Sequence, residues 1–298
     1  MRFLAVPLLA LVAACGGGVS TSDSETSTDA LQADTAPPEG AHVFYARGAA
    51  RAPSSSPDMT WHNGDVLATT TAGAVWWGAS WPTFTGDKIT GLDQWYQGFG
   101  GSNYAGTSDE YTGANGQVTS SVTYVGHFVD GSSAPGHAPK VSAIVAEACT
   151  YFPNPSANGF YAVYVDTKRG HAGYCAWHSW STCPSGAPIQ VAFFFNLDGD
   201  AGCDPQDTSG LHSQGLAALA NVSGHELSEA RTDPRGAGWF DSSGAENGDK
   251  CAWTYGAPLV TFSNATQWKI QGEWSNAAFN AGTGYPNSQG QNGCLSGQ

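Results

Sequence analysis

The sequence predicts an α+β protein with a mixed β-sheet core, one long helix, and loops rich in Gly and Trp. The chain of 298 residues contains 39 Gly, 16 Pro and 11 Trp, a composition typical of many turns and extended segments. Several short runs have the apolar pattern of strands, whereas only one region has a sustained helical repeat. Together these observations predict a sheet with few helices packed against it.

Four runs are predicted to be strands, because they alternate apolar and polar residues or are rich in β-branched and aromatic residues. These runs are 65–77, 117–124, 159–165 and 190–195. The run 140–148 fits a buried strand and a helix equally well. Residues 253–298 alternate aromatic and polar side chains among Gly and Asn, which predicts strands and loops.

The long helix is predicted over residues 213–231. Its apolar residues recur at spacings of three to four and seven to eight: Leu216, Leu219, Ala220, Leu227 and Ala230. The sequence Asp233-Pro234 ends it, since the residue before a proline is pushed out of the helical conformation. At about 100° per residue, His225 and Glu229 lie about 180° and 220° from Leu216. We therefore expect the Leu face to pack on the sheet and His225 and Glu229 to share the opposite face.

The first residues predict export. The stretch MRFLAVPLLALVAAC has one basic residue, a short apolar run and a Cys, which is typical of a lipoprotein signal peptide. We predict a signal peptide over 1–14, a lipidation site at Cys15 and a flexible tether rich in Ser, Thr, Gly and Asp over 15–40. A plain signal peptide with an incidental Cys is the alternative. One globular domain is expected over 41–298, anchored to the outer membrane or cell surface, or extracellular.

Charge and cysteine content narrow the class further. The formal net charge is −14, which argues against nucleic acid and anionic membrane surfaces as partners. Six Cys follow Cys15, and an even number in an exported chain predicts disulfides. We expect a local bridge between Cys175 and Cys183. A thiolate zinc site is not expected, because the chain has no C-x-x-C pair.

The stretch H-E-L-S-E at 225–229 differs by one residue from the H-E-x-x-H of helical zinc sites. His225 and Glu229 are one turn apart on the helix, as two ligands of one ion must be. We predict them as metal ligands together with Glu246, and Glu226 as the general base that takes a proton from water. Asp249 is expected to orient His225. The arrangement is also compatible with a zincin-like fold.

Each of these residues has a simpler interpretation. His225, Glu226 and Glu229 fit a solvated helix face, and Asp241 and Asp249 fit ordinary turn formation. If a metal is bound, Zn²⁺ is expected, with Ca²⁺ or Mn²⁺ as alternatives because two of the three ligands are carboxylates.

Other polar stretches favour structural roles. The acidic run of Asp198, Asp200 and Asp204 begins like a calcium loop but has no Glu at its twelfth position, so an acidic turn is expected. His178 and His62 are expected to be structural. The chain has neither a G-x-S-x-G elbow nor a Gly-rich phosphate loop.

Four long blocks carry a resemblance to a known family: MTWHNGDVLATTTAGAVWWGASW, LDQWYQGFGGSNYAG, HELSEARTDPRGAGWFDSSGAENGDKCAW and FSNATQWKIQGEWSNAAFNAGTGYPN. They resemble the phosphate-induced protein 1/Exordium family, in particular a bacterial branch with H-E-x-x-E-x-x-T-[DN]-P. The resemblance implies an exported protein. It brings no established reaction, and plant members, which are associated with the apoplast and growth responses, often have other residues at the positions of His225 and Glu226.

Two functions from different classes follow. The first is a lipid-tethered, metal-dependent hydrolase, most compatible with a peptidase. The second is a non-catalytic cell-surface protein that binds glycans or envelope material through its aromatic side chains and contains a structural metal. The expected partners are a peptide or envelope glycan and, through the lipid anchor, a membrane. A monomer is expected.

Overall fold

The structure is a computed structural model that describes residues 36–49, 57–136 and 139–298. The predicted signal peptide over 1–14, the lipidation site Cys15 and the tether up to residue 35 lie outside the described residues. The described residues form one compact unit.

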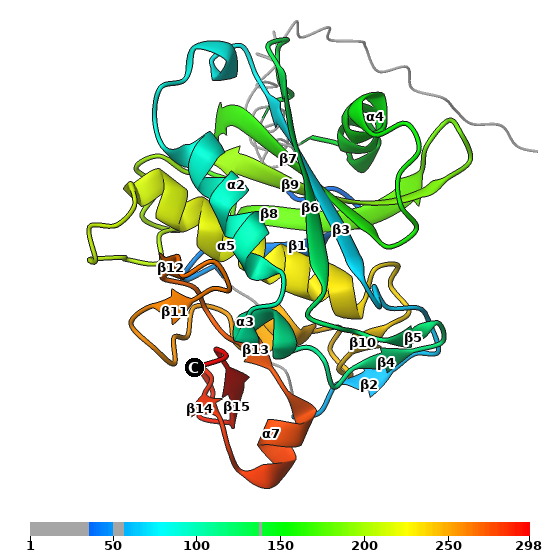
Figure 1. Cartoon of the computed structure of the whole chain (residues 1–298), viewed down its shortest axis with the longest axis vertical. Coiled ribbons are helices and arrows are strands. Elements are labelled where there is room, and N and C mark those ends of the chain that lie inside the picture. The colour runs from blue at the N-terminus through cyan, green and yellow to red at the C-terminus, as the bar shows by residue number, and fades with distance from the viewer. Residues whose placement is uncertain (1–35, 50–56, 137–138) are drawn as a thin grey trace, which may run out of the picture. The chain divides into compact units, whose positions relative to one another are not determined.

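A mixed six-stranded sheet forms the core of this unit, in the order β1-β8-β9-β7-β3-β6 (Figure 1). Strands β9, β7, β3 and β6 are parallel to one another, whereas β8 is antiparallel to β9 and β1 is antiparallel to β8. The sheet and its helices confirm the predicted α+β class. The strands are β1 His42–Tyr45, β3 Thr70–Trp77, β6 Val122–Asp130, β7 Gly159–Lys168, β8 Tyr174–Thr182 and β9 Pro188–Asn196.

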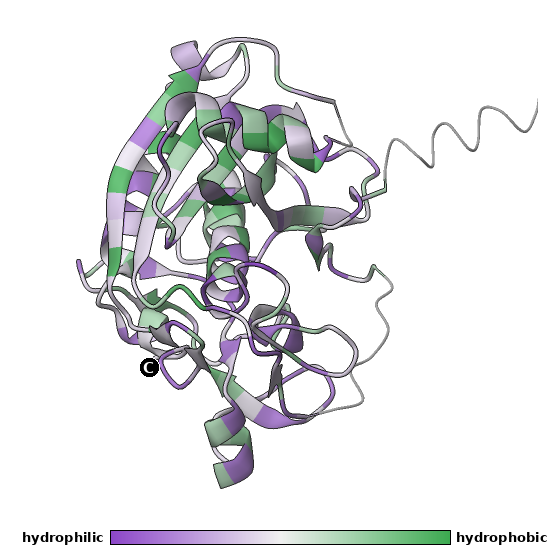
Figure 2. Cartoon of the chain, turned by 90° about the vertical axis from the view of Figure 1, so that its right-hand side faces the viewer, coloured by the Kyte–Doolittle hydropathy of each residue, from purple (hydrophilic) through white to green (hydrophobic). Residues whose placement is uncertain are grey.

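Helices cover both faces of the sheet. On β7, the hydroxyl of Tyr164 lies 2.8 Å from Ser223 of α5 (Gln214–Thr232) and 2.7 Å from Tyr96 of α2 (Lys88–Phe99). The neighbouring Tyr161 points to the other face, where its ring lies 4.5 Å from Phe152 at the end of α4 (Val141–Tyr151). Helices α2 and α5 therefore pack on one face and α4 on the other. In Figure 2 hydrophobic residues are concentrated in these layers.

Helix α5 agrees closely with the predicted helix. The side chain of Ser213 caps it by accepting a hydrogen bond from the backbone N–H of Leu216, and Asp233 ends it before the proline. However, each residue from Gly215 to Thr232 is buried. The polar face that we expected opposite the sheet lies against its edge, because His225 stacks on Phe44 of β1 with ring centroids 3.8 Å apart. A solvated helix face is thus contradicted.

The other elements are short, and all except η1 lie beside or below the lower half of α5 in Figure 1. They pair as β10 with β2, β4 with β5, β11 with β12, and β13-β15-β14. Their bounds are β2 Thr60–Trp61, η1 Trp81–Thr83, α3 Asn103–Gly106, β4 Thr112–Gly113, β5 Gly116–Gln117, β10 Trp239–Phe240, α6 Asn247–Lys250, β11 Val260–Thr261, β12 Gln267–Trp268, β13 Glu273–Trp274, α7 Asn276–Ala281, β14 Tyr285–Pro286 and β15 Asn292–Leu295.

The predicted strands hold in part. The runs 159–165 and 190–195 form β7 and β9, and 140–148 forms helix α4. The run 65–77 yields a strand only from Thr70 onward, and 117–124 is divided between β5 and β6. The C-terminal segment contains helix α7 as well as strands.

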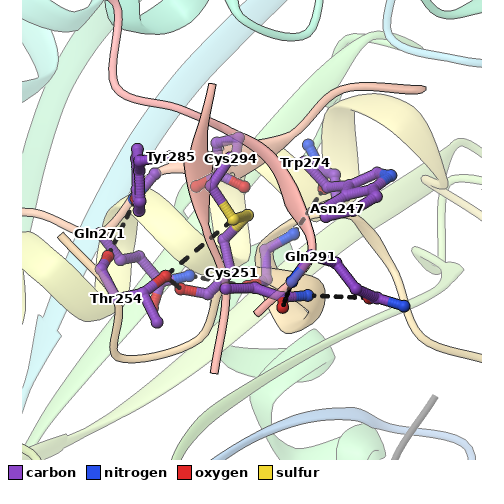
Figure 3. Close-up of a disulfide and its surroundings, with 12 residues drawn as sticks. Asn247, Cys251, Thr254, Gln271, Trp274, Tyr285, Gln291 and Cys294 are labelled. Atoms are coloured by element: carbon purple, nitrogen blue, oxygen red, sulfur yellow. Dashed lines mark hydrogen bonds between the residues drawn. A yellow bond between two sulfur atoms is a disulfide. The ribbon is translucent and has the colours of Figure 1, made fainter. Parts of the chain in front are cut away.

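Three disulfides link the described cysteines, and the predicted Cys175–Cys183 bridge is not among them. The two residues lie at the ends of the same extended strand, about 26 Å apart at about 3.3 Å per residue, which no disulfide spans. Such bonds place the protein in an oxidising compartment, as expected for export. Figure 3 shows one of them, which joins α6 to β15. The pairs are Cys149–Cys183, Cys175–Cys203 and Cys251–Cys294.

Among the helices of the described segments, none has the length and apolar character needed to cross a membrane.

Candidate metal centre

Seven histidine and carboxylate side chains gather where the edge of the sheet meets the second half of α5. Strands β1 and β8 supply one each, α5 supplies three, and the last two are Glu246, directly before α6, and Asp249 within α6. Their donor atoms form three overlapping groups of three, and the atoms within each group lie within 4.8 Å of one another. The groups are His42, His178 and Glu246; His178, Glu226 and Glu229; and His225, Glu229 and Asp249.

The register between β1 and β8 brings the two histidines of the sheet side by side. His42 of β1 is paired with His178 of β8, so both side chains point to the face that α5 covers, and their rings stack with centroids 4.9 Å apart. Nδ1 of His178 lies 2.9 Å from Oε2 of Glu226 on the helix. Its Nε2 points to the other side and lies 3.7 Å from Oε2 of Glu246. The His178 ring therefore connects the helix to the acidic turn.

The helix contributes its side chains through the turn spacing predicted from sequence. Nε2 of His225 lies 3.1 Å from Oε1 of Glu229 and 3.8 Å from Oδ1 of Asp249. The same Glu229 oxygen accepts a hydrogen bond of 2.8 Å from the backbone N–H of Asp249. On the far side of the ring, Nδ1 of His225 lies 3.1 Å from Nε2 of Gln271.

The acidic turn is formed by Asp241 and presents Glu246. One oxygen of Asp241 accepts hydrogen bonds from the backbone N–H groups of Ser243 and Ala245, which is the turn chemistry expected for Asp241. Glu246 precedes α6 in an extended conformation, and its Oε2 lies 2.6 Å from Nδ1 of His42. The turn is thus held to β1 by this contact.

Several distances match those between ligands of one ion. With metal–ligand bonds of about 2.0–2.2 Å, two ligands of a tetrahedral ion lie about 3.3–3.6 Å apart. The separations at His178 and His225 of 3.1 to 3.8 Å are close to this range, whereas the 2.6 Å between His42 and Glu246 is a hydrogen bond. Small movements of these side chains would accommodate an ion.

Burial dominates the electrostatics. His178, Glu226 and Glu246 are each at most 1% exposed. Burial raises the pKa of Glu226 well above its ordinary value, and the negative charges of Glu229, Asp249 and Glu246 raise it further. Burial likewise raises the pKa of Glu246, although His42 opposes this shift. Keeping these buried carboxylates ionised is therefore unfavourable, and a bound cation would stabilise them.

The histidines respond in opposite directions. The charge of Glu246 is the main cause that raises the pKa of His42 to about 10. Burial lowers the pKa of His178 well below its ordinary value, and the charges of His42 and His225 add to this effect. His178 is consequently a neutral imidazole, the form that binds metals.

The predicted site residues are thus brought together, but in a different grouping. His225 and Glu229 form a group with Asp249, which we expected only to orient His225. Glu246, predicted as their third ligand, is grouped with His42 and His178 instead. Glu226, predicted as the base, is hydrogen-bonded through Oε2 to Nδ1 of His178 at 2.9 Å.

Two members of the cluster were missed from the sequence. His178 was expected to be structural, and His42 was not considered. The signal that was available is the pattern around His178 in YCAWHSWST, a polar residue inside an otherwise buried strand of an exported protein. Only the pairing of β1 with β8 makes His42 its neighbour.

A pocket of about 410 Å³ lies beside the cluster and is lined by Asp249 of the cluster and by Phe44, which stacks on His225. It is bordered by the chain after β1, including Arg47, by Trp253 and by Gln289. The guanidinium of Arg47 lies 4.9 Å from the centre of the Trp253 ring. The cluster therefore adjoins a concave surface, although most of its members are buried.

The other candidates behave as their structural interpretations predict. His62 stacks on Phe240 with ring centroids 3.5 Å apart. In the acidic run, Asp198 pairs with Lys88 at 2.6 Å and Asp200 with Arg169 at 2.6 Å.

Comparison of the chain with protein-family models, with curated proteins and with solved structures found no match. The resemblance to the phosphate-induced protein 1/Exordium family stays a prediction.

Proposed function

We propose that the protein is an exported metal-dependent hydrolase whose divalent ion is bound by the buried histidine–carboxylate cluster. Three atoms of the cluster carry this proposal: Nε2 of His178, Oε1 of Glu226 and Oε1 of Glu246. Each is buried and has no hydrogen-bond partner among the described residues. Buried polar atoms almost always have a hydrogen-bond partner. Three buried atoms without one, each able to offer a lone pair to a metal, therefore support a bound ion in this cluster.

Charge supports the same conclusion. Four carboxylates meet in the cluster, and burying an ionised carboxylate costs several kcal/mol unless a positive charge or hydrogen bonds compensate it. The basic side chain on the same helix, Arg231, is directed elsewhere, since it donates to the backbone oxygens of Ala105 and Thr119. A divalent cation would offset two of the negative charges.

The donor set favours Zn²⁺ over Ca²⁺. Calcium is bound by oxygen atoms, whereas the cluster offers three imidazoles beside its carboxylates. Mn²⁺ remains an alternative because carboxylates suit it.

Glu226 is the general base in this proposal. A bound divalent ion supplies Lewis acidity, which polarises a carbonyl group and makes nearby water more acidic. Glu226 takes a proton from that water and passes it to the amine that leaves when the C–N bond of a peptide breaks.

A peptide is the substrate we propose, because the pocket beside the cluster combines aromatic, amide and charged side chains. Trp253, Asn287 and Gln289 line it, together with Arg47. Such groups bind the apolar and hydrogen-bonding parts of a polypeptide.

The alternative is a non-catalytic surface protein in which the cluster is structural, and burial favours it. Structural metal sites are closed, and five of the seven side chains here are at most 1% exposed. A network without metal belongs to the same alternative, since each histidine has a glutamate partner: His42 with Glu246, His178 with Glu226, and His225 with Glu229.

The test combines metal analysis with one substitution. The full mature chain is purified without chelators, its zinc and manganese contents are measured, and hydrolysis of a quenched peptide library is followed. Glu226→Gln should retain the shape of the site and lower hydrolysis by about 10²–10⁴-fold if Glu226 is the base. Bound metal without hydrolysis in the wild type supports the structural alternative, and absence of any metal supports the metal-free network.

Anchoring through Cys15 is part of the proposal. Cys15→Ser should release the protein from the membrane fraction or leave the precursor uncleaved. Unchanged partitioning of this variant contradicts lipidation at Cys15.

A further inference from the structure

We infer that the ion is held from the sheet side of the cluster by His178, Glu246 and His42, and that His225 is a positioning residue. This inference rests on the proposed metal centre. It moves the ligands away from the H-E-L-S-E stretch that first indicated a metal, and it makes β1 and β8 the elements that bind the ion.

His178 has the hydrogen-bond polarity of a metal ligand. Its Nδ1 lies 2.9 Å from Oε2 of Glu226, and with Glu226 ionised, as a general base must be, this oxygen accepts and the ring proton is on Nδ1. The lone pair is then on Nε2, which is buried and has no hydrogen-bond partner within the described segments. Histidines that bind metals almost always donate their other ring N–H in this way, often to a carboxylate.

Glu246 and His42 complete the donor set around Nε2 of His178. Oε2 of Glu246 lies 3.7 Å from this nitrogen, and Oε1 of Glu246 makes no hydrogen bond to any described residue. Nδ1 of His42 lies 2.6 Å from the same Oε2, a hydrogen bond that an ion would replace. Two imidazoles and one carboxylate form the His₂Glu set that catalytic zinc sites use with an open fourth position.

The sheet side also offers access. The side chain of His42 is 25% exposed, whereas those of His178 and Glu246 are nearly fully buried. An ion and a water molecule can therefore reach the group past β1, the edge strand of the sheet.

His225 has the opposite polarity. The orientation of the Gln271 amide is fixed, because its Oε1 accepts from the backbone N–H of Trp253 at 3.2 Å and its Nε2 donates to the backbone oxygen of Gly248 at 2.8 Å. The same Nε2 faces Nδ1 of His225 at 3.1 Å, so Nδ1 accepts and the ring proton is on Nε2. On this side of the ring, Nε2 lies 3.1 Å from Oε1 of Glu229 and 3.8 Å from Oδ1 of Asp249.

His225 is therefore suited to orient Glu229 rather than to bind the ion. Its ring is held between Phe44, with centroids 3.8 Å apart, and the Gln271 amide. The competing donor set of His225, Glu229 and Asp249 requires the ring proton to leave Nε2 and the Gln271 amide to turn against two hydrogen bonds.

The experiment measures zinc affinity by competition with a chromogenic chelator on the full mature chain. We expect His178→Ala and His42→Ala each to lower zinc affinity by more than about 100-fold, beyond the 10–100-fold typical of residues that only support a ligand. His225→Ala should lower it by less than about 100-fold. His62→Ala removes a histidine outside the cluster and should leave the affinity unchanged.

His42→Ala is the decisive variant, because His42 is partly exposed and its loss should leave the fold intact. Loss of zinc in His225→Ala with normal affinity in His42→Ala overturns the inference and assigns the ion to His225, Glu229 and Asp249. X-ray absorption at the zinc edge of the wild type gives a second measurement, with two imidazoles expected and one contradicting the inference.

The outcomes separate the inference from the proposed function. Zinc that depends on His42 and His178 but supports no hydrolysis upholds the inference and overturns the catalytic role. Hydrolysis that depends on zinc but not on His42 does the reverse. A wild-type chain that binds neither zinc nor manganese overturns both.

Discussion

Helix α5 and the β1–β8 edge of the sheet contribute to the same cluster, but they position its side chains by different means. On α5, His225 and Glu229 meet because residues four apart share a helix face, so their closeness is visible in the sequence. At the sheet edge, His42 and His178 meet because two distant strands pair in one register. A helix thus shows its site in a short motif, whereas a sheet shows it only after folding.

The two regions also differ in how many side chains they supply and in the contacts that their histidine nitrogens make. The helix supplies three of the seven side chains, yet its histidine is engaged by Gln271. The sheet supplies only two, and one of them, His178, has a bare buried nitrogen.

The largest expected effect comes from the side chain that joins the two regions. Phe44 of β1 is 1% exposed and stacks between His225 and Trp253. Phe44→Ala should lower the free energy of unfolding by about 3–5 kcal/mol, because a cavity replaces the ring. Val43→Ala, on the half-buried opposite face of the same strand, should cost only about 1 kcal/mol. Equal losses in denaturant titrations would show that backbone pairing alone holds β1 on the sheet.

Removing the ion should loosen both regions together. An ion present at about 100 times its dissociation constant stabilises the fold by about 2.7 kcal/mol, which corresponds to about 5–10 °C in Tm. Calorimetry with a chelator should show this decrease, and the same chelator saturated with zinc serves as the control. An unchanged Tm would indicate that the three His–Glu contacts hold the cluster without metal.

A smaller effect is expected on the helix side. A Cβ at Gly248 would lie 2.8 Å from Nδ1 of His225 and 3.1 Å from Oε1 of Glu229. Gly248→Ala should therefore lower the free energy of unfolding by about 1–3 kcal/mol through overpacking. Gly173→Ala is a matched control, because nothing lies within 4 Å of its Cβ position. If Gly248→Ala is as harmless as the control, the turn before α6 can shift, and His225 is less firmly held than we infer.

The smallest effect lies on the far face of the sheet. Burial and the charge of Asp130 raise the pKa of Glu147 on α4 from 4.5 to about 7. The folded state therefore binds this proton more tightly than the unfolded chain, and its contribution to stability falls as pH rises from about 4.5 to about 7. Glu147→Gln should remove this part of the pH dependence in denaturant titrations. A profile unchanged by the substitution would assign the pH dependence to other groups, such as the metal cluster.

Local signals predicted α5 well. The spacing of the Leu residues and Asp233-Pro234 predicted the helix almost to the residue, and Ser213, the first residue of the predicted range, is its N-cap. The same stretch also indicated Glu246 and Asp249 as nearby acids. Their division between two groups could not be predicted, because it depends on where α6 places its turn against β1.

Other elements were missed for reasons that the packing explains. Strand β8 is buried on both faces over most of its length, so it lacks the alternation that identifies a strand. Helix α2 contains Gly91 and Gly98, which weaken helix propensity. A Cβ at Gly91 would lie 2.3 Å from Leu216, so close packing on α5 explains this glycine.

The Cys251–Cys294 bond in Figure 3 makes the position of Glu246 and Asp249 depend on a strand near the end of the chain. Cys251 follows α6 directly, and Cys294 lies 43 residues further on in β15. The segment that carries Glu246 and Asp249 can be linked to β15 only after this strand has been synthesised and the two cysteines have been oxidised. In a reducing compartment this bond does not form, and the segment that carries two of the four carboxylates of the cluster then lacks its covalent link to β15.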